Sequence, residues 1–429
     1  MRLLFFNRSF HPDIEATGQL LTELCQDLSR DHEVVVVAGR GYNTARFGSW
    51  LPVRREQLDK IRILRAYNPR LNKKRFLGRI VNLLSYYCFG FAAGLFAGRP
   101  DVVIVETDPP VLGLIGMFYA RLYRAKFVFY VQDLFPDVGV ALGSLRHPWL
   151  VKLLETCTRW TLRGADKVIV LGEDMAARIK AKTCCDDSRI RVIPNWVDTT
   201  RVRPLAGLNP FRHKHQLEGK FVVMFSGNLG LSQDLERVVS IAADLADHDK
   251  MQFVFIGEGA AKAGLVKQAA ALQLKNVLFL PYEPKEALSE SLSAADVHLV
   301  TLKRGVAGLI VPSKAYGIMS AGRPFIAAVE EHSHIAEVIQ EHACGIRVDP
   351  ESTEQLRAAI LRAAENPEML EKMGQRGREA AVKCFDRQVS VGKFRALLAE
   401  IAQETTPPDG KSDEAGKSEE SLCATKTGR

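Results

Sequence analysis

Cysteine is sparse in this chain of 429 residues and is not arranged for metal binding or cross-linking. The eight cysteines are scattered without a C-x-x-C pair, and the adjacent Cys184 and Cys185 are poorly placed to bridge to each other. This usage excludes a zinc ribbon or a disulfide framework and is typical of a reducing cytoplasm. A secretory signal is also missing, because residues 1–6 read as a buried strand and are soon followed by acidic and polar residues.

Two further patterns are absent, and each absence excludes a class of site. No acidic pair or histidine cluster has the spacing of a metal site, so we expect no metal ion. Gly257-Glu258-Gly259 follows a predicted strand but lacks the third glycine of the dinucleotide fingerprint. A nicotinamide cofactor is therefore not supported, and we expect no cofactor.

Positive charge is concentrated in one segment. The chain has a formal net charge of +8, and residues 54–79 alone hold ten Lys/Arg against Glu56 and Asp59. Such a patch attracts polyanions, which here means nucleic acid, anionic lipid or a diphosphate substrate. Base-stacking residues are not interleaved over most of the segment and no recognition module is present, so we expect no nucleic acid.

An uncharged run follows the basic segment. Residues 80–98 read IVNLLSYYCFGFAAGLFAG, a length just sufficient to span a bilayer. Asn82, Ser85 and three glycines suit instead a helix packed inside a domain. Three interpretations stay open: a buried helix, a helix docked on a membrane surface, and a membrane span. The preceding basic residues support the second, with an anionic membrane surface as the partner.

Short β-branched runs alternate with helical stretches through both halves of the chain. This pattern predicts two doubly wound α/β domains with a cleft between them. We expect a first domain at 1–203, a second at 204–384, a C-terminal helix at 385–403 packing back on the first, and a disordered tail at 404–429. The predicted strands are 2–6, 33–38, 61–65, 102–106, 127–131 and 167–171, then 221–226, 252–256, 277–280, 297–300, 324–328 and 345–348.

The first strand of the second half leads into a glycine turn. Residues 221–226 run into GNLG at 227–230, and a helical pattern begins at Asp234. A turn between a strand and a helix exposes backbone N–H groups and the positive end of the helix, which suits a phosphate. Gly227 and Asn228 are therefore candidate ligand-binding residues, and a tight turn without a ligand is the alternative.

The stretch GVAGLIVPSK at residues 305–314 is the most informative one. Two glycines, the second of them Gly308, precede Ser313 and Lys314 at the expected start of a helix. Backbone N–H groups, a hydroxyl and an ammonium would then be presented together, as a diphosphate requires. The alternative is a glycine-rich loop with a solvated lysine.

The loop after the first strand, residues 10–19, precedes a helix that we expect to begin near Thr17 or Gly18. The N-terminus of this helix would face the cleft and accept a phosphate of the donor or acceptor, unless Thr17 or Asp13 simply caps the helix. We include Thr17 and Gly18 as the acceptor or phosphate loop. His11, in the same loop, is a candidate catalytic residue.

Asp133 and Asp137 flank a three-residue turn directly after a predicted strand. Carboxylates at the C-terminal end of a parallel strand point into the ligand crevice. Asp133 could accept a sugar hydroxyl or help to deprotonate an acceptor, and it is the second candidate catalytic residue. The alternative is a turn in which aspartate caps the next helix.

Together these stretches resemble family 4 glycosyltransferases of the GT-B fold, and most resemble the L-fucosamine and colanic-acid-type transferases of bacterial polysaccharide assembly. The resemblance runs from residue 6 to about residue 398. It implies an α/β GT-B architecture of two facing Rossmann-like domains, and transfer with retention at the anomeric carbon without a metal. It also implies that the second domain holds the donor diphosphate, where fixed charges stabilise the departing nucleotide. The motifs are FHPDIEATGQ, PDVVIVETDPP, YVQDLFPD, ADKVIVLGEDM, RVIPNWVD, FSGNLGLSQDLE, GLIVPSKAYGIMSAGRP and CGIRVDP.

The sequence departs from the broad family pattern at four positions. The Glu-x7-Glu motif of the family aligns with Leu309 and Gly317, and its phosphate-binding Arg and Lys align with Asn228 and Gln233. We therefore expect Ser313, Lys314 and loop amides to bind the diphosphate. Glu337, in a following helix, is available to contact the ribose. The donor-binding candidates are Gly227, Asn228, Gly308, Ser313, Lys314, Glu337 and Tyr282.

We expect a retaining, metal-independent glycosyltransferase of the hexosyltransferase type, acting in bacterial surface polysaccharide assembly. Its donor would be a nucleotide sugar, with UDP as the expected nucleotide, and its acceptor a lipid-linked molecule or a saccharide. The basic segment and the apolar run favour a lipid-linked acceptor and a peripheral position on the cytoplasmic face of the cell membrane. The alternative is a non-catalytic nucleotide-sugar-binding component of a polysaccharide assembly complex, which the missing Glu-x7-Glu carboxylates favour.

Overall fold

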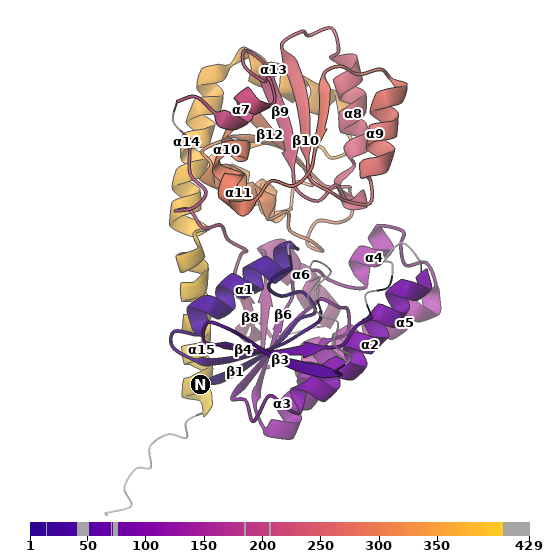
Figure 1. The fold of residues 1–429 in the computed structure, drawn as a ribbon, viewed down its shortest axis with the longest axis vertical. Helices are drawn as coiled ribbons and strands as arrows, with labels where there is room; N and C mark the ends of the chain where they lie inside the picture. The colour runs from indigo at the N-terminus through magenta and orange to yellow at the C-terminus, as the bar shows by residue number, and fades with distance from the viewer. Residues whose placement is uncertain are drawn as a thin grey trace, which may run out of the picture.

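The computed structural model describes residues 1–13, 15–40, 51–69, 71, 76–183, 186–205 and 207–405. Within these ranges the chain forms two α/β units, each built around a sheet of its own and stacked along the long axis of the molecule (Figure 1). Cys184, Cys185 and the part of the predicted tail after residue 405 lie outside the described residues.

The sheet of the first unit has eight strands. Its outermost pair is antiparallel and all its other pairings are parallel. The chain winds outward in both directions from β1, so the connecting helices cover both faces of the sheet. In sheet order the strands are β3 (Val53–Leu58), β4 (Ile61–Ala66), β2 (Glu33–Ala38), β1 (Arg2–Phe6), β5 (Val102–Glu106), β6 (Lys126–Tyr130), β7 (Lys167–Val170) and β8 (Ile190–Val192).

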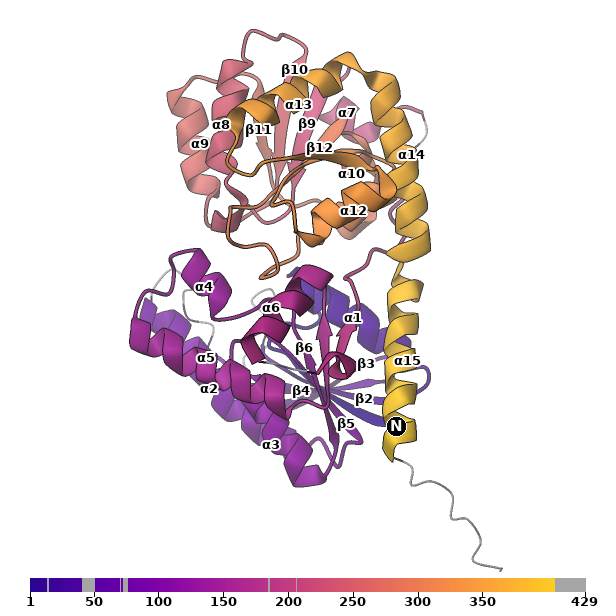
Figure 2. The same ribbon diagram turned by 180° about the vertical axis from the view of Figure 1, so that it is seen from behind.

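The helices of the first unit lie on both sides of this sheet (Figures 1 and 2). One side carries the first helix of the chain, and the opposite side carries the layer formed by the second, third and fifth helices. The helices are α1 (Ala16–Leu28), α2 (Phe76–Gly94), α3 (Gly113–Tyr123), α4 (Asp137–Ala141), α5 (Pro148–Gly164), α6 (Glu173–Thr183) and the 3₁₀ turn η1 (Asp187–Arg189).

The second unit has a six-stranded, fully parallel sheet. In sheet order its strands are β11 (Val277–Leu280), β10 (Met251–Ile256), β9 (Phe221–Ser226), β12 (Val297–Thr301), β13 (Phe325–Ala328) and β14 (Gly345–Val348). Its helices are α7 (Pro210–Lys214), η2 (Leu231–Gln233), α8 (Leu235–Asp244), α9 (Lys262–Ala271), η3 (Lys285–Ala287), α10 (Leu288–Ser293), α11 (Lys314–Ser320), α12 (His334–His342), α13 (Thr353–Glu365) and α14 (Pro367–Cys384).

All twelve predicted strands are present, each within one residue of the expected ends. Two strands, β3 and β8, were not predicted from the sequence, for different reasons. β3 reads VRREQL and is only partly buried at the edge of the sheet, so it has no apolar run. β8 has three residues and is below the length at which a pattern can be recognised. The buried strands were easy to find because helices cover both their faces, which makes them continuous apolar runs.

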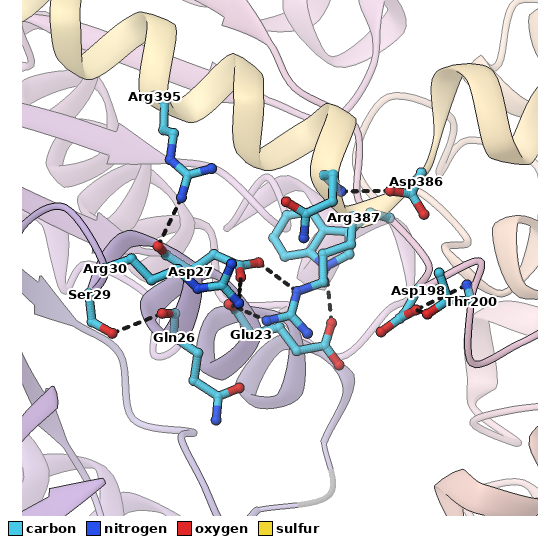
Figure 3. Close-up of polar contacts among 12 residues, drawn as sticks. Glu23, Gln26, Asp27, Ser29, Arg30, Asp198, Thr200, Asp386, Arg387 and Arg395 are labelled. Atoms are coloured by element: carbon cyan, nitrogen blue, oxygen red, sulfur yellow. Dashed lines mark hydrogen bonds and ion pairs between the residues drawn. The ribbon is translucent and has the colours of Figure 1, made fainter. Parts of the chain in front are cut away.

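The last helix, α15 (Arg387–Thr405), leaves the second unit and packs on the first (Figure 2). Val391, Phe394, Leu397, Leu398 and Ile401 are buried in the same apolar core as the first sheet. Figure 3 shows Arg387 pointing from the start of α15 toward α1. The helix is offset by two residues from the expected range 385–403 and takes in the first two residues of the predicted tail.

The predicted basic segment at residues 54–79 is largely folded into the first sheet. Arg65 lies within β4, buried, with its guanidinium 2.9 Å from a carboxylate oxygen of Glu56. Arg62 pairs with Glu33 and donates to the backbone of Ala97. Arg70 and the cluster Lys73-Lys74-Arg75 lie outside the described residues.

The uncharged run at residues 80–98 forms most of α2 and packs on the first sheet. The hydroxyl of Tyr86 is buried and donates to the carbonyl of Val37 in β2. Of the helices that the structure describes, none combines the length and the hydropathy needed to traverse a bilayer. The opposite side of α2 is exposed.

Candidate functional site

A cavity of about 410 Å³ lies between the two units, at the carboxyl ends of the strands of the second sheet. Both units and the segment that joins them line it. The lining residues are Ala16, Gln19, Leu20 and Glu23 of α1, Trp196, Val197, Asp198, Arg201 and Val202 of the joining segment, and Ser226, Gly227, Asn228, Gln233, Lys285, Leu288, Leu292, Val311, Pro312, Ser313, Lys314, Gly317 and Ile318 of the second unit.

A second hollow, of about 640 Å³, lies on the second unit near Arg323, Glu371 and Arg378. It is larger, but none of the residues singled out from the sequence lines it. The interdomain cavity contains four of them, namely Gly227, Asn228, Ser313 and Lys314. We therefore take the interdomain cavity as the candidate site.

Lys314 contributes an ammonium group to the cavity wall. Its Nζ lies 3.4 Å from the centre of the Phe225 ring and 3.3 Å from the amide oxygen of Gln233. Within the described part of the chain, no carboxylate pairs with it. Burial lowers the pKa of Lys314 well below its ordinary value, because the charged form loses hydration without gaining a counter-charge. An anion in the cavity would supply that counter-charge.

Two glycine turns let the loops after β9 and β10 approach each other beside Lys314. Gly227 (φ 135°) and Gly257 (φ 142°) both adopt a backbone conformation that favours glycine. A Cβ atom on Gly257 would lie 2.0 Å from the carbonyl oxygen of Gly227. The close contact therefore requires glycine at position 257, and it leaves the backbone around Gly227 and Asn228 facing the cavity.

Gly308, predicted to bind the donor, does not line the cavity and instead contacts the first unit. Its φ is 69°, and a Cβ atom there would lie 2.8 Å from the carbonyl oxygen of Asp174 in α6. Leu309, the next residue, is buried in the core of the first unit and accepts a hydrogen bond of 2.8 Å from the amide of Leu134. The loop after β12 therefore joins the two units.

Asp133 follows β6 and lies outside the cavity lining. Its amide donates to the hydroxyl of Thr107, and its side chain is exposed to solvent although protein surrounds it on most sides. Restricted hydration, with a smaller effect of the nearby Asp108 carboxylate, raises the pKa of Asp133 to about 6. A carboxyl with this pKa can exchange a proton near neutral pH.

His11, Thr17 and Gly18 also lie outside the lining of the cavity. Burial and the Arg65 guanidinium lower the pKa of His11, so the imidazole is neutral at physiological pH. Gly18 packs against the loop before α1, where a Cβ atom would lie 3.1 Å from Ser9. α1 still lines the cavity, but with Ala16, Gln19, Leu20 and Glu23.

Tyr282 and Glu337 do not contact the cavity either. The hydroxyl of Tyr282 lies 3.4 Å from the carbonyl oxygen of Glu258, and the ring is half-exposed beside the Gly257 turn. Glu337 belongs to the first turn of α12 and faces the acidic start of α6. Burial, together with the carboxylates of Asp174 and Glu173, raises the pKa of Glu337.

The sequence analysis missed the charged residues on the far wall of the cavity. Glu23 of α1 accepts a 3.1 Å hydrogen bond from the indole of Trp196 and lies 3.3 Å from the ammonium of Lys285 in the second unit. Asp198 and Arg201, in the joining segment, line the same wall. No motif marks these residues, because they meet only when the two units come together. Among the described residues, no group of three or more His, Cys, Asp or Glu is placed to hold a metal ion.

Both halves of the chain match glycosyltransferase sequence families. Residues 16–196 match a "Glycosyl transferase 4-like domain", and residues 209–380 match "Glycosyl transferases group 1". WbjE of Pseudomonas aeruginosa, a probable glycosyltransferase, is 31% identical over 341 residues, which cover 79% of this chain and 84% of WbjE. The chain belongs to glycosyltransferase family 4. WcaI of Escherichia coli K12, a glycosyl transferase assigned to colanic acid biosynthesis, is 27% identical over 410 residues, which cover 92% and 98% of the two chains.

Solved structures confirm the predicted GT-B fold of this family 4 glycosyltransferase. Sucrose-phosphate synthase of Thermosynechococcus elongatus superposes with a TM-score of 0.74 at 16% identity and covers 94% of this chain and 100% of the synthase. HepE of Anabaena in complex with UDP superposes with a TM-score of 0.69 at 15% identity and covers 93% and 100%.

The two positions that align with the family's Glu-x7-Glu motif, Leu309 and Gly317, lie in different parts of this glycosyltransferase. Leu309, at the first position, is withdrawn from the cavity into the core of the first unit. Gly317, at the second, lines the cavity and leaves its wall open beside Leu292. Neither position offers a carboxylate to a ligand.

Proposed function

We propose that this glycosyltransferase moves a hexose from a UDP-linked donor to a lipid-linked or saccharide acceptor, with retention at the anomeric carbon and without a metal ion. The observation that carries the proposal is the partly buried Lys314 ammonium, which lines a cavity of nucleotide-sugar size without a carboxylate partner among the described residues. A diphosphate bound there would neutralise it, and the ammonium would in turn stabilise the charge that develops on the departing nucleotide. The structures of HepE with UDP and with UDP-glucose support UDP as the nucleotide.

The proposed roles follow the position of each residue relative to the cavity. Ser313, Lys314 and the backbone of Gly227 and Asn228 bind the diphosphate. Asp133, on the first unit, accepts a proton from the acceptor hydroxyl or orients that hydroxyl, because its pKa lies close to neutrality. We retain the other sequence candidates, which lie outside the cavity lining of the ligand-free protein, as groups near the cleft: His11, Thr17, Gly18, Tyr282, Gly308 and Glu337.

We further propose that the reaction belongs to bacterial surface polysaccharide assembly and takes place on the cytoplasmic face of the cell membrane. The relative WcaI supports this assignment, since its name places it in colanic acid biosynthesis. A lipid-linked acceptor would bring the first unit, which carries Asp133, close to the bilayer.

The direct test is a thermal-shift screen of UDP, GDP and their sugar conjugates, since a ligand that binds only the native state raises its stability. We expect UDP and one or more UDP-hexoses to raise the melting temperature, and GDP to have little effect. Donor turnover should persist with excess chelator. Absence of any nucleotide effect, or turnover that needs magnesium or manganese, would contradict the proposal.

A non-catalytic nucleotide-sugar-binding protein is the second candidate. The absence of a carboxylate at Leu309 and Gly317 favours it. The two candidates differ in turnover: a binding component would show the UDP-sugar thermal shift but release no UDP, whether by transfer to an acceptor or by slow hydrolysis.

A further inference from the structure

We propose that the exposed face of the α2–α3–α5 layer is an apolar docking surface for an anionic lipid membrane. On α2 an uninterrupted stripe of apolar side chains faces solvent. It consists of Leu77, Val81, Leu84, Cys88 and Phe91, which follow one another at intervals of three or four residues and so share one side of the helix, and it is continued by Leu95 directly after the helix. Leu77 is 74% exposed and Leu84 56% exposed, although the opposite side of α2 is buried on the sheet.

The stripe continues across the two neighbouring helices. Phe91 of α2 and Phe118 of α3 are in ring contact, with centroids 5.0 Å apart. α3 and α5 approach closely at Gly113, where a Cβ atom would lie 2.2 Å from a methyl carbon of Thr161. Figures 1 and 2 both show the three helices side by side on one side of the molecule. Their solvent-facing sides therefore form one surface.

α5 adds two exposed tryptophans to this surface. Trp149 is 68% exposed and Trp160 58% exposed, with Leu153 between them on the same side of the helix. Tryptophan is enriched where one end of a side chain is in an apolar phase and the other in water, as at a membrane interface. Contiguous exposed apolar patches of this kind are unusual on monomeric proteins and mark interaction sites.

The charges around the patch favour anionic lipid as the occupant. Lys152 and Arg163 lie three residues after Trp149 and Trp160, so each cation is on the same side of α5 as a tryptophan. Glu155 is the sole acidic residue within α2, α3 and α5 among the described residues, and it is paired with Lys182 and Arg159. Long basic side chains can reach lipid phosphates while their stems cover apolar surface. A second copy of the same basic surface would be repelled.

The cations of this docking surface are not those of the basic segment at residues 54–79 that was predicted to bind the membrane. Arg62 and Arg65 of that segment are engaged in ion pairs within the first unit. The exposed cations beside the tryptophans come instead from a part of the chain about 90 residues further on.

The docking surface adjoins the side of the first unit that faces the second unit. α4, with Val140 45% exposed, lies between the start of α5 and the second unit (Figure 1). Docking would thus bring the acceptor side of the cleft to the lipid headgroups. This inference rests on the proposed function only in its choice of a lipid-linked acceptor.

The test is sedimentation of the full chain with vesicles of phosphatidylcholine alone and of phosphatidylcholine with phosphatidylglycerol. We expect binding that requires the anionic lipid and weakens at high salt. Trp149→Ser with Trp160→Ser should weaken it about tenfold or more, which is about 1.4 kcal/mol. Lys152→Glu with Arg163→Glu should remove the preference for anionic lipid.

Two matched variants on the second unit serve as controls: Leu208→Ser with Leu272→Ser, and Lys267→Glu with Lys275→Glu, all at exposed positions. The controls should bind vesicles as the unaltered chain does. The tryptophan variant should keep the thermal shift with UDP, which shows that the fold and the cavity are intact.

Lack of binding to anionic vesicles, or binding that the tryptophan variant leaves unchanged, would overturn the docking surface. A concentration-dependent dimer that the tryptophan variant abolishes would assign the surface to a second copy and would also overturn it. Vesicle binding without any nucleotide thermal shift would instead contradict the proposed function and leave the docking surface standing.

Discussion

The guanidinium Nε of Arg387 lies 2.7 Å from Oδ2 of Asp27, so the first residue of α15 is paired with a residue of α1 located 360 positions earlier (Figure 3). The carboxylate of Asp27 is 1% exposed, and Arg387 also donates to the carbonyl of Glu23. A buried ion pair contributes modestly to stability, but removal of Arg387 would leave the buried Asp27 carboxylate with the exposed Arg30 guanidinium, 3.3 Å away, as its remaining ion-pair partner among the described residues.

Arg387→Ala should therefore lower the free energy of unfolding by about 3–5 kcal/mol, measured by urea titration. Lys180→Ala removes an exposed pair with Asp187 and should change the same quantity by less than about 1 kcal/mol. Equal effects of the two variants would show that the Asp27 carboxylate is hydrated in solution.

Replacement of Lys314 should weaken nucleotide binding without weakening the fold. Lys314→Ala removes a charged hydrogen-bond donor from the cavity, and we expect UDP affinity, measured by calorimetry, to fall by about 1–3 kcal/mol. The free energy of unfolding should stay the same or rise, because the ammonium is partly buried without a carboxylate partner in the described chain. Lys303→Ala, at an exposed position after β12, is the control and should bind UDP normally. Normal UDP affinity in the Lys314 variant would remove this residue from the site.

The pH dependence of transfer should report the ionisation of Asp133. Its pKa is about 6, so the carboxylate that accepts a proton is present above this pH and is lost below it. We expect the rate to fall as the pH is lowered through 6, and Asp133→Asn to reduce the rate about 10²–10⁴-fold and abolish this dependence. Asp137→Asn, four residues later, is the control and should keep the inflection.

Stability provides an independent check on the same group. A raised pKa means that folding disfavours the charged carboxylate, so the stability contribution is present below the unfolded-state pKa and is lost as the pH rises through 6. Asp133→Asn should therefore raise the melting temperature at pH 7. A lower melting temperature would indicate a structural role.

Replacement by alanine should change the stability in opposite directions at Gly257, which directly follows β10, and at Gly264, which lies within α9. Gly257→Ala places a Cβ atom 2.0 Å from the carbonyl oxygen of Gly227 at a φ of 142°, so it should destabilise the fold by about 1–3 kcal/mol and weaken UDP binding. Gly264→Ala meets no atom within 4 Å in a helix interior and should stabilise by about 0.5–1 kcal/mol. Equal UDP affinity in the two variants would show that the contact between the β9 and β10 loops does not shape the cavity.

Much of the fold could be predicted from the sequence because both sheets are covered on both faces. β9 was located without error, since six residues that are mostly apolar end at a glycine turn. β3 escaped notice because its four central residues, RREQ, are all polar, and only its antiparallel pairing with β4 makes it a strand.

The site was predicted less completely than the fold, and the reason is geometric. Gly227 and Lys314 could be predicted to line the cleft because Gly227 directly follows β9 and Lys314 begins α11 after the loop that follows β12. Glu23 and Lys285 were missed because they are 262 residues apart and meet only across the cleft. Gly308 lies outside the cavity lining, because its loop approaches α6 so closely that a Cβ atom at this position would meet the backbone of Asp174.

The packing of α15 on the first unit has a consequence for how the protein is made. Five buried side chains of this helix, the last of them Ile401, complete a core whose other buried members, apart from Leu309, belong to the first half of the chain. During synthesis the first unit emerges from the ribosome early but lacks this side of its core until nearly all of the second unit has followed. A fragment that stops before the second unit would expose that apolar surface to solvent, so the first unit is best expressed with α15 supplied in trans or fused to it.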